Sequence, residues 1–490
     1  MGFGKSGGGP TVGINIGTSL IKVVEARPGK SGPQITALGV APTPPGVIDN
    51  EVIVDPQTLG QAIRRLLSDS GISCKKCVSS VAGQSSVVVR IIEVPKMTKQ
   101  ELAETMKWEV ERHVPFAANE VIMDFQPLER PGADPADQNM EVLLAVAQQE
   151  FVNSHIEALF AAGLQPIALD VESLATCRAL IDIVKDEQED TIAIVNIGAA
   201  TTEMAVYQNK LLAFPRTLPI AGDAITRALS DGLHITTEQA ESLKRERGAV
   251  LLDRVQGAGA DIGFETTQSD DEVSNGATMG ISSAAEEAAD DDLGFIPGLG
   301  FSFGAPEAET PDAVEPAPDA GTGEEAPPSG GMPFMDFDLS GGEDQAPAPT
   351  PQFDLSGPVE PISPDFASVP AVTADAGEAE VDTDQLTDEA IFDAMSAVLT
   401  DLIAEVRRSI EYYASRFQSQ PGKIFLCGGT SKLRALDKLF QAELGIPVVL
   451  ANPLENVTVF SKSLEQDYLE EVATVFPVGV GLAIRDLMGD

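Results

Sequence analysis

The chain has few basic residues, few aromatic residues and few cysteines. Its 490 residues include 32 Lys and Arg against 76 Asp and Glu, with 1 Trp, 4 Tyr and 4 Cys. The absence of a basic stripe that could meet phosphates argues against nucleic acid as a ligand. Cys74 and Cys77 have the spacing of a zinc or redox motif, but Cys177 and Cys427 are too distant in sequence to complete such a site. We therefore predict a reducing compartment and no metal ion held directly by side chains.

Long apolar runs are also missing. No run reaches the roughly 18 residues of a membrane span, and the N-terminus lacks the hydrophobic stretch of a signal peptide. We therefore expect a cytoplasmic protein without direct membrane insertion.

The acidic excess is concentrated in one segment. Between Arg254 and Arg407 there is no Lys or Arg, whereas 34 Asp and Glu lie there. Residues 253–385 are rich in Pro, Gly, Ala, Asp and Glu without apolar periodicity, so this segment cannot bury enough surface to offset its ordering entropy. We predict a disordered acidic insertion. The motif Phe-Asp-Leu-Ser-Gly occurs in this segment at 337–341 and again at 353–357. It is either a short apolar motif that docks onto a partner or a chance repeat in a low-complexity sequence.

Two segments far apart share a pattern suited to phosphate binding. Residues 12–24 and 192–207 each contain a β-rich run, the tripeptide Asn-Ile-Gly, and hydroxylated residues just beyond the Gly. A strand followed by a tight turn with Gly and Thr places N–H groups and hydroxyls around an anion, although a buried hairpin has the same pattern. The recurrence favours a duplicated fold with two phosphate-holding hairpins that face each other.

The remaining pattern alternates strands and helices, which indicates an α/β fold. Residues 85–165 interrupt it with a strand-helix-strand-strand-helix block that resembles a compact insertion with its own core. We predict helices at 55–70, 98–113, 149–162, 172–183, 224–233, 237–247, 387–417 and 478–488.

Three elements would build one nucleotide pocket. The two hairpin turns could hold phosphates from two sides, and the double glycine at 428–429 would let a base or ribose lie flat against backbone. Charged pairs one turn apart on two helices could grip a ribose and adenine, although exposed pairs of this kind are usually solvated. The predicted nucleotide-contacting residues are Asn15, Gly17, Thr18, Ser19, Lys22, Asn196, Gly198, Ala199, Thr201, Glu241, Lys244, Glu405, Arg408, Gly428 and Gly429.

This order of elements resembles the actin-like ATPase superfamily, and within it most closely the PilM family of type IV pilus assembly proteins, in the FtsA and PilM branch. The resemblance covers the whole chain except the first ten residues and the acidic segment. It is carried by residues 13–25, 94–95, 108–109, 114–116, 169–172, 195–199, 240–244, 405–413 and 428–429.

The resemblance implies a two-lobed actin-like fold, a duplicated ribonuclease H-like α/β architecture with a small inserted α+β subdomain. It also implies ATP or ADP with Mg²⁺ in the cleft. The chain would then divide into a flexible tail at 1–10, a first lobe at 11–84 and 166–190, the inserted subdomain at 85–165, a second lobe at 191–252 and 386–490, and the disordered insertion at 253–385.

The resemblance further implies a membrane-bound partner. In PilM-like proteins a groove near the insertion takes the short cytoplasmic N-terminal peptide of the inner-membrane protein PilN, which would hold the chain at the inner face of that membrane. Other components of the pilus machine, or further copies of the chain, are additional candidate partners.

Two positions depart from the superfamily pattern. An acidic residue is common in each phosphate hairpin, but here Asn15 and Asn196 stand there. An amide contributes no negative charge to hold a cation and is not a general base. Glu172 is the best remaining catalytic candidate, and we predict nucleotide binding with slow or absent hydrolysis. The alternatives are an FtsA-like cell-division or filament protein and a genuine ATPase or kinase of the superfamily.

Overall fold

The structure is a computed structural model, and it describes residues 9–30, 32–83, 86–130, 137–182, 191–254, 383–460 and 465–488. Nearly all of the predicted acidic insertion, with both copies of its repeated motif, lies outside the described residues, as does most of the predicted N-terminal tail.

The first sheet has six strands, in which an antiparallel meander is extended by two parallel strands. β1, β2 and β3 pair antiparallel in chain order, and β6 and then β10 continue the sheet parallel to β1. Side chains of β1 such as Val12 and Ile14 are fully buried. In spatial order the strands are β10 (Gln165–Val171), β6 (Lys76–Val81), β1 (Thr11–Ile16), β2 (Leu20–Gly29), β3 (Gly32–Pro42) and β16 (Thr458–Val459).

The second sheet repeats this topology with five strands. β11, β12 and β13 form the antiparallel meander, and β14 and then β15 extend it in parallel from β11. The predicted duplication and the two-lobed α/β fold class are therefore confirmed. The spatial order is β13 (Leu211–Leu218), β12 (Thr202–Gln208), β11 (Thr191–Ile197), β14 (Lys423–Cys427) and β15 (Val448–Leu450).

A third, three-stranded antiparallel sheet lies within the predicted insertion. Helix α2 (Lys99–His113) starts at a capping box in which Thr98 and Glu101 exchange hydrogen bonds, and it buries Leu102 and Met106 in a small core of its own with this sheet. The strands, in spatial order, are β7 (Val87–Pro95), β9 (Asn139–Gln148) and β8 (Val121–Leu128).

Helix α3 (Gln149–Ala161) follows β9 directly but packs elsewhere. It contributes Phe151 and Leu159 to the large core of the first sheet, and it lies against α1 (Pro56–Asp69). The last helix of the five-element block expected at 85–165 thus also belongs to the core of the first sheet, because the apolar face of α3 packs into that larger core.

Two of the remaining helices begin at capping residues. Thr387 caps α8 by accepting a hydrogen bond from the Ala390 N–H, and α6 begins at a second capping box. The predicted helix at 172–183 is instead α4 (Glu172–Cys177) followed by a π-helical turn, η2 (Arg178–Asp182). The others are α5 (Gly222–Leu233), α6 (Thr237–Arg247), α8 (Asp388–Phe417), α9 (Leu436–Leu444), α10 (Gln466–Val472) and α11 (Pro477–Ile484).

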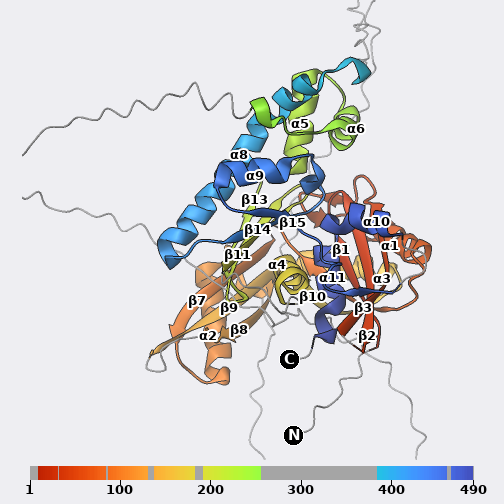
Figure 1. Ribbon diagram of the computed structural model, residues 1–490. Coiled ribbons are helices and arrows are strands. Elements are labelled where there is room, and N and C mark those ends of the chain that lie inside the picture. Colours follow the sequence, from red (N-terminus) through yellow and green to blue (C-terminus); the bar gives the residue numbers. More distant parts are fainter. Residues whose placement is uncertain are drawn as a thin grey trace, which may run out of the picture. The chain divides into compact units, whose positions relative to one another are not determined.

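Helices α4 and α11 pack against each other, and α11 also lies along β1 (Figure 1). From the second sheet, the Tyr207 hydroxyl donates a hydrogen bond of 2.7 Å to the carbonyl oxygen of Ser173 on α4. This pair of helices therefore connects the strands that carry the two predicted phosphate hairpins. Among the described residues, no helix combines the length and the apolar character that a membrane span requires.

Candidate functional site

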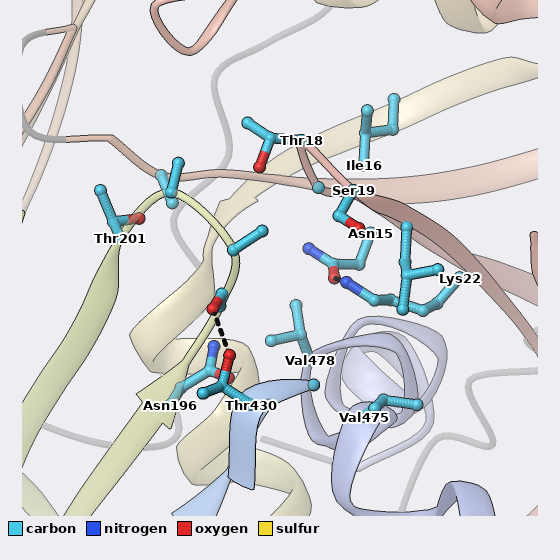
Figure 2. A pocket seen from close by; sticks show the side chains of 18 of the residues that line it. Asn15, Ile16, Thr18, Ser19, Lys22, Asn196, Thr201, Thr430, Val475 and Val478 are labelled. Carbon is cyan, nitrogen blue, oxygen red and sulfur yellow. Dashed lines mark hydrogen bonds between the residues drawn. The ribbon is translucent and has the colours of Figure 1, made fainter. Parts of the chain in front are cut away.

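One cavity of about 480 Å³ is lined by the turns of both sheets (Figure 2). The β1–β2 turn and the β11–β12 turn are closed in the same way, since the Gly17 N–H donates to the Leu20 carbonyl and the Gly198 N–H donates to the Thr201 carbonyl, each at 3.0 Å. The cavity brings together fourteen of the predicted site residues: Asn15, Gly17, Thr18, Ser19, Lys22, Glu172, Asn196, Gly198, Ala199, Thr201, Glu241, Lys244, Gly428 and Gly429.

A lysine, an amide and a carboxylate are linked at the first turn. Lys22 Nζ donates to Asn15 Oδ1 at 2.8 Å, and Asn15 Nδ2 donates to Glu172. Ser80 Oγ donates to the same Glu172 oxygen at 3.3 Å. Burial lowers the pKa of Lys22 and raises the pKa of Glu172, and each charge partly offsets the shift of the other. The arrangement places one cation, with a carboxylate behind it, beside the turn that carries Thr18 and Ser19.

The second turn has a carboxylate that sequence reasoning did not assign. Glu203 lies opposite Asn196 in the β11–β12 register and lines the cavity. Its Oε2 accepts a hydrogen bond of 3.0 Å from Thr217, whereas its buried Oε1 has no hydrogen-bond partner among the described residues. Burial, followed by the nearby Glu172 charge, raises the pKa of Glu203 to about 8. In the sequence, the only hint of this role was that Glu203 lies seven residues after Asn196. The hint can be used only once the strand register is known, because the register pairs these two residues across the hairpin.

The double glycine serves two different needs. Gly428 has φ +93°, and a Cβ there would collide with the Ile197 carbonyl oxygen, so backbone geometry alone requires glycine. A Cβ on Gly429 would meet no atom within 4 Å. Gly429 therefore leaves open space in the cavity wall, as the proposed close approach of a ligand requires.

Two of the predicted residues lie elsewhere. Glu405 and Arg408, on α8, form an ion pair of 2.8 Å, and Glu405 also pairs with Arg216 of β13 at 3.1 Å. Neither lines the cavity. The expectation that they contact nucleotide is therefore corrected: an (i, i+3) charged pair on a helix shows adjacency, but the sequence does not show which neighbouring strand that face meets.

Other polar side chains complete the lining. His155 on α3 lies 2.8 Å from Ser79 Oγ, whose own proton goes to the Ile14 carbonyl, so the His155 Nε2–H is the donor of this pair. Burial lowers the pKa of His155 to about 4, which keeps the ring neutral. Further lining residues outside the prediction are Glu51, Asp223, Arg245, Thr430, Lys432 and Glu471.

Over the described ranges, no cluster of three or more His, Cys, Asp or Glu side chains has a geometry that could hold a metal ion. The hard oxygen donors around the two turns include the carboxylates of Glu172 and Glu203 and the amides of Asn15 and Asn196. This donor set suits a divalent cation that keeps most of its ligands as water and phosphate oxygens, which is how Mg²⁺ usually binds with nucleotides.

Known proteins share this architecture. The family model described as type IV pilus assembly protein PilM matches residues 13–250, and that of cell division protein FtsA matches residues 193–469. The FtsA protein of Bacillus subtilis is 25% identical to this chain, over 52% of the chain and 61% of the relative. The FtsA protein of Pseudomonas aeruginosa is 24% identical, over 51% of the chain and 64% of the relative. The chain thus spans a little over three fifths of these relatives.

A solved structure, the PilM-PilN type IV pilus biogenesis complex, is similar over nearly its full length. It has a TM-score of 0.63 and 24% identity, covering 98% of this chain and 99% of that one.

Twin hairpin turns from two matching sheets, facing one cavity, define an actin-like ATPase fold. The chain belongs to the branch of the actin-like ATPase superfamily that the PilM and FtsA families form.

Proposed function

We propose that the chain is an actin-like nucleotide-binding scaffold of type IV pilus assembly, or of a related secretion machine. The observation that carries the proposal is the pair of identically closed turns that meet at one cavity beside Lys22. Turns with Gly and hydroxyl residues bind phosphate through N–H and O–H groups, and the partly buried Lys22 adds the charge. ATP or ADP would place its phosphates there and its base toward Gly429.

Mg²⁺ that enters with the nucleotide would neutralise phosphate charge, and Glu172 is placed to hold one of its waters. Glu172 already accepts hydrogen bonds from Asn15 and Ser80. With amides in both hairpins, we propose that hydrolysis is slow or absent and that the bound nucleotide acts as a structural signal.

A second hollow of about 790 Å³ supports a peptide partner. It lies between β5 (Val52–Ile53), α3 and η1 (Ala118–Glu120), with Val54 56% exposed at its edge. Its apolar side chains are Ile53, Val54, Pro56 and Phe116, and its carboxylates are Glu120, Glu150 and Glu157.

No Lys, Arg or His occurs among the described residues that line this hollow. A lining of apolar side chains and carboxylates suits a peptide that carries both apolar and basic residues. We propose that the cytoplasmic N-terminal peptide of a PilN-like inner-membrane protein docks there. That contact would hold the chain at the inner face of the membrane.

The test is a titration of the purified full-length chain with ATP and with ADP, each with Mg²⁺, in the presence and absence of a synthetic N-terminal peptide of a PilN-like protein. We expect saturable binding of both nucleotides and a turnover too slow to account for binding. If neither nucleotide binds under either condition, the proposal is wrong. Brisk ATP hydrolysis would instead favour the genuine ATPase alternative.

The FtsA-like alternative rests on the FtsA family match to the second half of the chain. Because that match covers the fold common to both families, it favours an actin-like protein more than a cell-division role. Polymerisation of the ATP-bound chain, measured by sedimentation without a peptide partner, would favour the filament alternative.

A further inference from the structure

The C-terminal half of α8 and the strand β13, at one end of the second sheet, form a surface of aromatic and basic side chains. On α8 the residues at 405, 408, 412 and 416 recur at helical spacing and therefore share one face. That face meets β13, because the ring centroids of Tyr412 and Phe214 lie 5.5 Å apart and Arg216 Nη1 donates to Ser409 Oγ at 2.8 Å. We call this surface the α8–β13 patch, and its residues are Phe214, Arg216, Glu405, Arg408, Tyr412 and Arg416.

The α8–β13 patch carries more positive than negative charge. Its one carboxylate, Glu405, is shared by two guanidiniums, since Oε2 pairs with Arg216 at 3.1 Å and Oε1 pairs with Arg408 at 2.8 Å. Arg416 is also exposed, and counting the exposed Glu411 nearby on α8 still leaves a positive excess. The Arg408 side chain is 65% exposed, so a second carboxylate can approach it from solvent.

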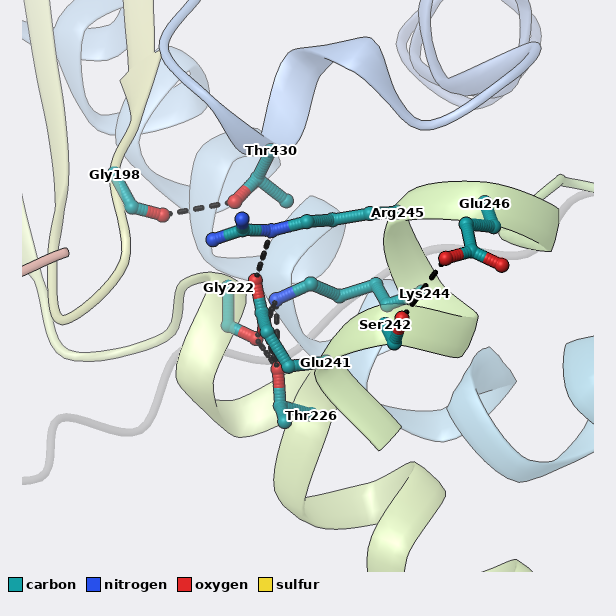
Figure 3. A network of polar contacts seen from close by, with 9 residues as sticks. All are labelled: Gly198, Gly222, Thr226, Glu241, Ser242, Lys244, Arg245, Glu246 and Thr430. Carbon is teal, nitrogen blue, oxygen red and sulfur yellow. Dashed lines mark hydrogen bonds and ion pairs between the residues drawn. The ribbon is translucent and has the colours of Figure 1, made fainter. Parts of the chain in front are cut away.

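A similar arrangement on α6 belongs to the cavity instead. There Lys244 and Arg245 share the carboxylate of Glu241 (Figure 3), at N–O distances of 2.5 and 2.7 Å. All three line the cavity that the two turns face, whereas none of the six residues of the α8–β13 patch does. The α8–β13 patch is therefore available to a ligand other than the proposed nucleotide.

The side chains of the patch match a peptide that has an aromatic residue beside a carboxylate. A ring can pack against the Phe214 and Tyr412 pair, and a carboxylate forms charge-assisted hydrogen bonds with guanidiniums. The chain itself contains such a motif twice, because Phe-Asp-Leu-Ser-Gly occurs at 337–341 and 353–357. Residues 255–382, which include both copies, contain 28 Asp and Glu and no Lys or Arg, so charge favours their approach to a positive surface.

The length of chain between the motifs and α8 allows this contact. The second copy ends at Gly357, 26 residues before Thr383, where the described chain resumes. A chain of that length spans at most roughly 86 Å, whereas Tyr412 lies about 36 Å along the helix axis from Asp388 at the start of α8. A tether of this kind gives an effective concentration on the order of millimolar, so even weak binding would occupy the patch.

We propose that the α8–β13 patch is a docking site for the Phe-Asp-Leu-Ser-Gly motif of the same chain. The Phe ring of the motif packs against Phe214 and Tyr412, and its Asp carboxylate pairs with Arg408 or Arg216. Either copy can occupy the patch, because the five residues are the same. Docking requires neither nucleotide nor a partner peptide, so it is tested separately from the proposed function.

Photocross-linking of the purified full chain tests this docking. Tyr412→p-benzoylphenylalanine places a photoreactive ring in the patch, and adducts are mapped by mass spectrometry after cleavage at acidic residues, because residues 255–382 contain no trypsin site. We expect adducts to 337–341 or 353–357. Tyr468→p-benzoylphenylalanine, at a tyrosine of similar exposure on α10, is the matched control and should not capture the motif. Adducts spread evenly over residues 255–382, or none to either copy, would overturn the proposal.

Variants of charge and of the motif test the two halves of the contact. In the Tyr412→p-benzoylphenylalanine chain, Arg408→Glu should lower the adduct yield about tenfold, because repulsion replaces attraction. Arg65→Glu makes the same change of charge at an exposed ion pair on α1, and the yield should stay within about twofold. Phe337→Ser combined with Phe353→Ser should abolish the adducts. Equal yields in Arg408→Glu and Arg65→Glu would contradict the docking.

Two further measurements establish the fold and the occupant. Thermal melts show whether each variant is folded, and if Tyr412→p-benzoylphenylalanine is not, Arg408→p-benzoylphenylalanine places the same probe one turn earlier and should give the same adducts. Mixing isotope-labelled with unlabelled chains separates docking within one chain from docking between copies. Adducts that join a labelled to an unlabelled chain would make a second copy the occupant and would overturn the proposal.

Discussion

At the scale of single residues, Gly428 and Gly429 follow β14 side by side but tolerate different changes. Gly428 has a positive φ and touches the Ile197 carbonyl, whereas Gly429 has φ −64° and ψ −37°, which any residue adopts, and faces open space. The fold requires the first glycine, whereas at the second position only the proposed ligand would require glycine.

Gly429→Val should therefore separate binding from folding. We expect wild-type thermal stability, because the Cβ that is added meets no protein atom within 4 Å. We expect about a tenfold or greater loss of ATP affinity, because the side chain occupies space that the nucleotide would need. Gly428→Ala should instead lower the melting temperature. Calorimetry and thermal melts of both variants check this, and unchanged ATP affinity in Gly429→Val would contradict it.

Glu203 provides a second residue-scale prediction, on pH. Its folded-state pKa of about 8 lies above the ordinary glutamate value. The folded state therefore holds a proton that the unfolded state releases, and stability is lost as pH rises from the ordinary value through about 8.

Glu203→Gln keeps the shape of the neutral acid without the charge. We expect a small effect on stability at about pH 5 and stabilisation on the order of 5 kcal/mol at about pH 9. Urea unfolding at both pH values measures it. Equal effects at the two values would mean that Glu203 does not titrate in this range.

At the scale of elements, the crossing of α4 and α11 depends on small residues. A Cβ on Gly481 of α11 would collide with the backbone of Ala175 on α4. Arg178 fixes the crossing, since its Nη1 donates to the Gly481 carbonyl at 2.9 Å and its Nη2 pairs with the buried Asp170 at 3.0 Å. The two helices therefore approach at backbone distance, and the hydrogen bond from Arg178, whose guanidinium is also paired with Asp170, ties α11 to the chain that follows α4.

Gly481→Ala should be strongly destabilising, although alanine favours helices. Overpacking of this kind costs about 1–3 kcal/mol or more, because backbone must move to make room. Gly479→Ala, two residues earlier on α11, meets the Val24 side chain at 3.0 Å, a smaller conflict, and should cost less. Denaturant melts of the two variants test this order, and a reversed order would contradict the close crossing.

The element scale also shows where sequence patterns were sufficient. Capping residues and apolar periodicity identified α2, α6 and α8 closely, because these are local signals. They did not indicate that α3 joins the core of the first sheet, nor that the helix after β10 ends in a π turn, because both depend on which distant surface each face meets.

At the scale of the whole molecule, the proposed peptide groove and the nucleotide cavity are separate hollows that share Ile53 in their linings. Val54 lines only the groove and is 56% exposed, so its replacement need not disturb the core. Separate linings allow the two ligands to be tested independently.

Val54→Asp should abolish capture of the PilN-like peptide while ATP affinity stays within about twofold of wild type. A charge placed among the apolar lining residues must be desolvated by the bound peptide, which costs more than the contact returns. Fluorescence anisotropy with a labelled peptide measures the first effect and calorimetry the second. Glu104→Ala on α2, whose carboxylate makes an exposed ion pair with Lys107, is the matched control. Peptide capture by Val54→Asp at wild-type affinity would exclude this groove.

The sequence by itself determined the order of strands and helices and the two Asn-Ile-Gly hairpins, because these follow from local periodicity, turn chemistry and repetition. Part of the cavity lining follows from the hairpins. The tertiary structure alone decided that Glu203 faces the cavity, that Glu405 faces β13, and that Lys244 is enclosed by Gly222 and its neighbours. Those facts depend on strand register and on contacts between elements distant in sequence, and no local pattern encodes which of several polar faces will be desolvated.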